Sequence, residues 1–93
     1  MKYRMLYKIL SCLYAAGESS SKGIYGEHPL NSLSLTEEEI YEIPYLVREG
    51  YVCIFESVWG RSMQFTTKGL ETFCSLDEEI YLNSITNYRG VIE

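Results

Sequence analysis

The stretch that decides the fold is residues 48–69, REGYVCIFESVWGRSMQFTTKG. It opens on the end of a predicted helix, because Gly50 has no Cβ and takes the left-handed conformation that reverses the chain at low cost. Residues 51–59 are dense in β-branched and aromatic side chains and predict a strand. Residues 60–62 predict the turn, and residues 63–66 the returning strand. The stretch therefore predicts a helix that leads directly into a β-hairpin.

The helix before this hairpin is predicted to run over residues 36–49. Its first residues, Thr-Glu-Glu-Glu, have the form of a capping box, in which Thr36 and Glu39 satisfy each other's free backbone N–H groups. Pro44 lies in the middle of the helix and predicts a kink, because proline removes one helical hydrogen bond. The face expected to contact the core carries Ile40, Ile43 and Val47.

The chain before and after these elements also has helical patterns. Residues 2–16 predict an amphipathic helix that Gly17 ends, with core side chains at Leu6, Ile9, Leu10 and Leu13 and a tyrosine stripe of Tyr3, Tyr7 and Tyr14 beside them. Residues 18–35 predict a loop that holds one short helix. Thr66 or Thr67 is expected to cap a short helix after the hairpin. Ser75 is expected to cap a last helix.

The order of these elements resembles a winged helix-turn-helix domain. The resemblance rests on the phrase Arg48-Glu49-Gly50-Tyr51-Val52 before the hairpin and on Phe65-Thr66-Thr67-Lys68-Gly69 after it. It points in particular to the small YjcQ-like winged-helix proteins, and more loosely to the PadR and MarR regulators. It implies an α+β fold, in which residues 1–74 form a three-helix core with a β-hairpin wing and residues 75–93 form a helical extension.

The resemblance further implies a small transcription regulator that binds double-stranded DNA. In the family, the helix before the wing enters the major groove and a basic wing tip contacts the backbone, so Arg61 becomes the tip cation. The residues assigned to phosphate contacts are Lys22, Arg48, Arg61 and Lys68. A homodimer would form through residues 75–93 or through the tyrosine stripe.

The charge of the predicted recognition helix supports a second hypothesis of another class. Residues 36–50 hold one positive and five negative charges, hence −4, and DNA would repel this helix. Its outward face carries Glu38, Tyr41, Glu42, Tyr45 and Glu49. Tyrosine is enriched at protein interfaces because it offers a large amphipathic contact area. The alternative is a winged helix that binds a basic protein surface, for example a phage or mobile-element inhibitor of a nucleic-acid-binding host protein.

Composition excludes several other classes of protein. The chain has 93 residues, enough for one modest core, and 46% of them are hydrophobic, which argues against disorder. Its 8 basic and 13 acidic residues leave a net charge of −5, opposite to that of a nucleic-acid-binding arm. No apolar run approaches the roughly 20 residues of a membrane span.

The residues that carry chemistry are few and scattered. Cys12, Cys53 and Cys74 form no close pair, and with the single His28 they do not match a zinc site. They are expected to be buried thiols in a reducing cytoplasm. No phosphate loop and no nucleophile–base pair is evident in the sequence. We therefore expect a cytoplasmic protein that is not an enzyme and that holds neither metal nor cofactor.

Overall fold

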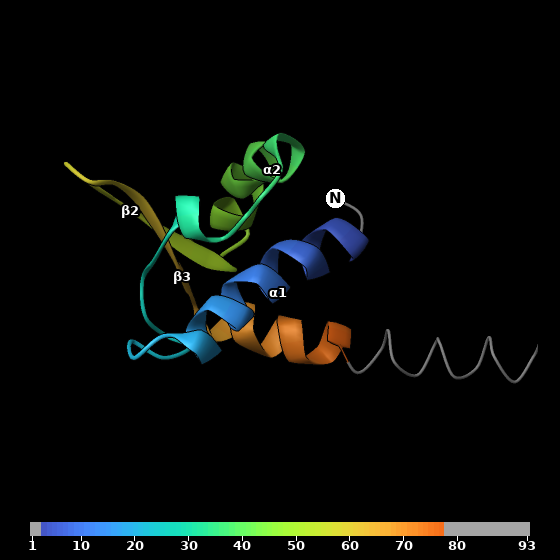
Figure 1. Ribbon diagram of the computed structural model, residues 1–93. Helices are drawn as coiled ribbons and strands as arrows, with labels where there is room; N and C mark the ends of the chain where they lie inside the picture. The colour runs from blue at the N-terminus through green and yellow to red at the C-terminus, as the bar shows by residue number, and fades with distance from the viewer. Residues whose placement is uncertain (1–2, 78–93) are drawn as a thin grey trace, which may run out of the picture.

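The computed structural model describes residues 3–77, which form an α+β fold of three α-helices, one short 3-10 helix and a three-stranded antiparallel sheet (Figure 1). Helix α1 lies between the other two α-helices (Figure 1). Its Lys8 contacts Glu39 of α2. Its Tyr7 contacts Phe73 of the helix over residues 67–77. The elements in chain order are α1 (Tyr3–Ser19), β1 (His28–Pro29), the 3-10 helix η1 (Leu30–Ser32), α2 (Glu37–Arg48), β2 (Val52–Ser57), β3 (Gly60–Phe65) and a helix over residues 67–77.

The sheet has the strand order β1-β3-β2, and both pairings are antiparallel. The hairpin of β2 and β3 was predicted, and so was a short helix in the loop before α2, which is η1. The two-residue strand β1 was not predicted. It pairs His28 with Met63, and such a short strand has no sequence pattern of its own.

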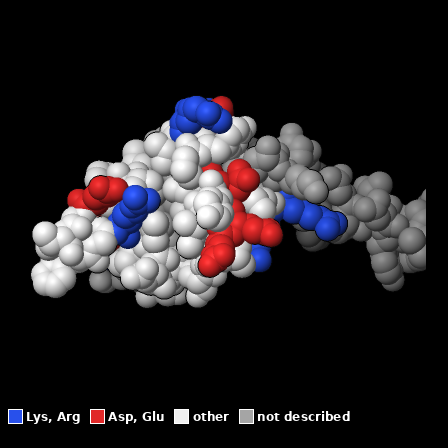
Figure 2. Space-filling model, turned by 90° about the horizontal axis from the view of Figure 1, so that it is seen from above, with Lys and Arg blue, Asp and Glu red and all other residues white. Residues whose placement is uncertain are grey.

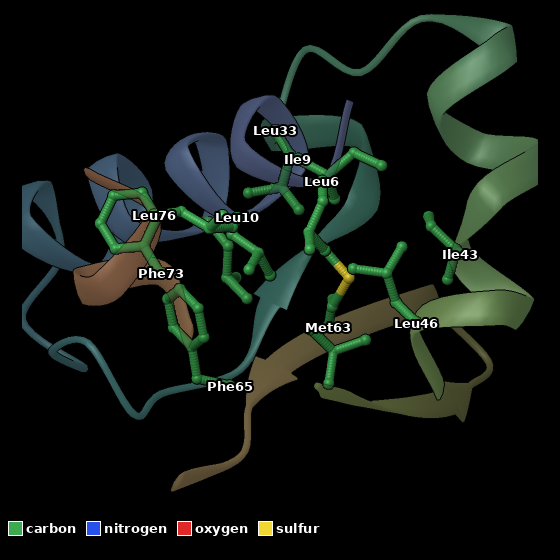
Figure 3. Close-up of a cluster of buried hydrophobic side chains, with 12 residues drawn as sticks. Leu6, Ile9, Leu10, Leu33, Ile43, Leu46, Met63, Phe65, Phe73 and Leu76 are labelled. Atoms are coloured by element: carbon green, nitrogen blue, oxygen red, sulfur yellow. The ribbon is translucent and has the colours of Figure 1, made fainter. Parts of the chain in front are cut away.

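The core confirms the predicted apolar face of α1, because all four of its predicted side chains are buried. Three of them, Leu6, Ile9 and Leu10, are labelled in Figure 3. Each such side chain stabilises the fold by about 1.5–3 kcal/mol relative to an exposed one. The other buried hydrophobic residues come from every later part of the described chain: Leu33, Ile43, Leu46, Val52, Met63, Phe65, Phe73 and Leu76.

Helix α1 does not end at Gly17, as predicted, but continues to Ser19. Gly17 is buried, and a Cβ at this position would lie 2.6 Å from the Cα of Ile24. The glycine therefore allows the returning loop to approach the helix closely. The left-handed conformation occurs later, at Gly23, where φ is 81°.

The capping box of α2 is confirmed, but of its predicted buried face only Ile43 is buried. Thr36 N–H donates to Glu39 Oε1 at 2.8 Å, and Glu39 N–H donates to Thr36 Oγ1 at 3.2 Å. The side chains turned to the core are Glu39, Ile43 and Leu46, whereas Ile40 and Val47 remain 44% and 41% exposed. The helix is rotated because Leu46 packs into the core while Glu39 approaches Lys8 of α1. It runs through Pro44 without interruption.

The hairpin turn lies earlier than predicted. Val58 and Trp59 form a two-residue loop closed by the pair Ser57 and Gly60, so residues 60–62 belong to β3. Gly60 takes a φ of 114° at the start of the strand, and Ser57 Oγ accepts the Trp59 N–H at 3.1 Å. Glycine therefore marks the end of the turn and not its centre.

The helix over residues 67–77 begins as predicted, with Thr66 as its cap, because Thr66 Oγ1 accepts the Gly69 N–H at 3.0 Å. It continues through Ser75, so the prediction that Ser75 begins a new helix is wrong. The remaining predicted extension, residues 78–93, lies outside the described residues.

Two members of the predicted tyrosine stripe are used inside the chain. The rings of Tyr7 and Tyr14 stack on Phe73, with ring centroids 5.5 and 5.0 Å apart. Tyr7 also donates to Asp77 Oδ1 at 2.7 Å, and this hydrogen bond raises the pKa of Tyr7. The stripe thus joins α1 to the helix over residues 67–77, which accounts for these two tyrosines without a second chain.

Candidate functional site

Arg61, the predicted tip cation, is not at the tip of the hairpin. It lies in β3 directly opposite Glu56, and its Nε is 3.0 Å from Glu56 Oε1. The prediction failed because it placed the turn at Gly60, two residues too late. Both side chains of this ion pair are largely exposed, so the pair adds little stability, and Glu56 places a carboxylate beside the cation.

The other predicted DNA contacts do not form one basic surface. Lys22 lies in the loop after α1, and its Nζ donates to the Glu27 carbonyl at 3.4 Å. Arg48 lies over the ring of Tyr45, 5.4 Å from its centroid. Lys68 donates to the Glu49 carbonyl at 2.6 Å and lies 4.9 Å from the centre of the Tyr51 ring. Arg48 and the Glu49 carbonyl that Lys68 contacts both lie at the carboxyl end of α2, where cations are favourable.

The predicted acidic face of α2 is only partly open to solvent. Glu38 and Tyr41 are exposed, and Tyr41 is 82% accessible. Glu42, Tyr45 and Glu49 are half-buried. In the view of the face that carries α2, acidic side chains gather near the middle, while the hairpin end is mostly uncharged (Figure 2).

An apolar groove lies between α2 and the hairpin, where the sequence predicted core. It holds about 290 Å³, and its lining residues are Leu30, Ile40, Ile43, Pro44, Val47, Ile54 and Arg61. Ile40, Pro44 and Val47 follow one another at helical spacing on the exposed side of α2. The sequence signal was therefore present, but periodicity alone does not say whether an apolar stripe is covered.

The tip of the hairpin is apolar and fully exposed. Val58 is 93% and Trp59 is 92% accessible, and Phe55 is 42% exposed on the outer side of β2. Valine and tryptophan are unusual choices for a two-residue turn, which prefers Asn, Asp and Gly. The apolar pair Val58 and Trp59 was therefore a signal of an unusual hairpin tip, which the prediction from sequence did not use.

A second depression, of about 630 Å³, lies where the first turn of α2 meets α1. Its innermost carboxylate is Glu39, which is 3% exposed, and Lys8 Nζ is 3.8 Å from Glu39 Oε1. Burial would raise the pKa of Glu39, but the Thr36 backbone N–H, the Thr36 hydroxyl and Lys8 together hold it below its ordinary value. The carboxylate therefore stays ionised and joins α2 to α1.

The three cysteines are free thiols, and none of them forms a hydrogen bond with His28 within residues 3–77. Cys12 is half-buried, and burial, followed by the charge of Glu39, raises its pKa. Cys53 and Cys74 are exposed, contrary to the expectation of buried thiols, because they lie on the outward sides of β2 and of the last helix. His28 is buried, with Nε2 3.2 Å from the Gly23 carbonyl oxygen. Over residues 3–77 no three His, Cys, Asp or Glu side chains lie close enough to hold a metal ion.

Comparison of the chain with known protein families, with curated proteins and with solved structures finds no match in any of the three. Within the described residues no helix is both long and apolar enough to cross a membrane. The candidate site is therefore defined by the structure of this chain alone. It consists of an apolar groove, the acidic helix α2 beside it and an exposed apolar hairpin tip.

Proposed function

We propose that this protein is a binding module for another protein, built on a winged-helix-like scaffold. The observation that carries the proposal is the apolar groove between α2 and the hairpin. Its rim leaves Ile40 and Val47 partly exposed, and a soluble domain seldom leaves such side chains together without a partner. The element order and the sheet order β1-β3-β2 support the scaffold.

The partner's chemistry follows from what borders the groove. Glu38 and Tyr41 are exposed on the adjacent face of α2, so a partner with an apolar side chain flanked by lysine or arginine matches both features. The apolar side chain would fill the groove, and the basic residues would meet the carboxylates. The exposed thiols of Cys53 and Cys74 suit a reducing compartment, and we place this activity in the cytoplasm.

DNA binding by a regulator is the second candidate. It is supported by the same element order and by two cations at the end of α2, Arg48 in its last turn and Lys68 on the Glu49 carbonyl. Arg48 stacks on Tyr45, Arg61 is paired with Glu56, and α2 carries three acidic residues in its first turn. We therefore rank protein binding first.

The test places a photo-crosslinking amino acid at Tyr41, beside the groove, and a control at Ser75, on the last helix. We expect a discrete crosslinked protein from position 41 only, which disappears when Val47→Asp puts a charge on the groove rim. In parallel, the purified protein is titrated with random-sequence duplex DNA at low salt. Salt-sensitive binding that Arg48→Glu abolishes, with no crosslink specific to position 41, would favour the DNA-binding candidate instead.

A further inference from the structure

Strand β2 has an edge that no other strand covers among residues 3–77. The sheet order β1-β3-β2 places it at one side, with all six of its residues paired to β3 on the other. Five of these six residues are at least partly exposed. An exposed strand of this length offers backbone groups for pairing with a further strand.

The hydrogen-bond pattern of the hairpin identifies which backbone groups face that edge. Thr66 N–H donates to the Tyr51 carbonyl at 3.2 Å, so this pair is a hydrogen-bonded one. Bonded and non-bonded pairs alternate along an antiparallel ladder. In the register of β2 and β3, the other hydrogen-bonded positions of β2 are therefore Cys53, Phe55 and Ser57, whose backbone N–H and C=O groups point to β3. The groups that point away from β3 belong to Val52, Ile54 and Glu56.

Charge favours a second copy of this chain over a basic partner at this edge. Residues 50–66 hold one glutamate and one arginine, so the hairpin is neutral in a chain of net charge −5. These two residues, Glu56 and Arg61, are already paired with each other. Two copies that meet edge to edge therefore bring together segments that carry no net charge. A basic partner is attracted to α2 and not to β2.

We propose that two copies pair through their β2 strands, antiparallel about a twofold axis at Phe55, to form one six-stranded sheet. In this register Phe55 of one copy lies opposite Phe55 of the other, at a non-hydrogen-bonded position where side chains come closest. The Glu56 N–H of each copy then meets Ile54 of the other. The pairing uses backbone groups and the outer aromatic side chain, so the groove stays available for the partner proposed above.

The test compares two substitutions at one position by sedimentation equilibrium. Glu56→Pro removes the N–H that points to the edge, and proline is tolerated there because this group makes no bond to β3. Glu56→Ala removes the same side chain and keeps the N–H. We expect a wild-type dimer whose dissociation constant rises about tenfold or more in Glu56→Pro, while Glu56→Ala stays within about threefold of the wild type.

A second pair of variants covers the case in which Glu56→Pro fails to fold, as judged by circular dichroism. Phe55→Lys places a charge at the proposed twofold axis, and Trp59→Lys places the same charge at the hairpin tip, outside the paired strands. We expect Phe55→Lys alone to be monomeric. A monomeric wild type, or a dimer that survives both Glu56→Pro and Phe55→Lys, would overturn the proposal, and neither result bears on the groove.

Discussion

Replacing Gly69 by alanine tests how the last helix is attached to the hairpin. A Cβ at this position would lie 1.8 Å from the Tyr51 carbonyl oxygen, so the contact must open by about 1.6 Å to reach an ordinary 3.4 Å. Overpacking of this kind costs about 1–3 kcal/mol. The movement also disturbs the two hydrogen bonds that Thr66 donates to the Tyr51 carbonyl, through its N–H and its hydroxyl, at about 1 kcal/mol each.

Alanine is the better helix former by at most about 1 kcal/mol, which offsets part of this loss. We therefore expect Gly69→Ala to lower the free energy of unfolding by about 2–4 kcal/mol, measured by urea titration followed by circular dichroism. The control is Ser75→Ala, an exposed position on the same helix, where the change should stay within about 0.5 kcal/mol. A Gly69→Ala protein as stable as the wild type would refute the packing of this helix against Tyr51.

Three further changes probe the core, the capping box and the hairpin tip. Leu13→Ala, at a fully buried position of α1, should cost about 2–5 kcal/mol in the same titration, and a loss below about 1 kcal/mol would contradict the central place of this helix. Glu39→Gln should cost about 1–2 kcal/mol at neutral pH. Because folding lowers the pKa of Glu39 from an ordinary value near 4.5, its contribution is complete above that pH and is lost as the pH falls through the lower folded-state value. Thermal unfolding measured across this range should therefore show the two proteins converging in acid, and a constant difference would contradict the ionised carboxylate. Trp59→Ser, at the exposed tip, should change the melting temperature hardly at all, whereas a marked drop would mean that the ring is packed.

The candidate site that the structure offers differs in kind from the one that the sequence suggested. Sequence reasoning looked for charged and aromatic contacts, and the structure pairs or stacks several of these within the chain, as with Arg61 on Glu56 and Arg48 on Tyr45. The groove and the hairpin tip, which stay exposed, are mainly apolar. This follows from the rotation of α2, which leaves Ile40 and Val47 beside the hairpin.

Local signals in the sequence determined the elements themselves. The capping box at Thr36 and Glu39, the apolar face of α1 and the β-branched run after Gly50 each depend on neighbours in the chain, so their outcome could be predicted. The cap at Thr66 is of the same kind.

Only the tertiary structure decided how these elements face one another. Which side of α2 is buried depends on Lys8 of α1, which is distant in sequence, and on packing against the hairpin, because α2 carries apolar residues on both its buried and its exposed side. Gly17 and Gly69 are required by backbone contacts with Ile24 and Tyr51, and such contacts have no local pattern. The position of the hairpin turn was set by strand register, which placed Gly60 in β3 and left Trp59 at the tip. Register and helix rotation arise from packing between distant segments, and a single sequence holds no direct signal for them.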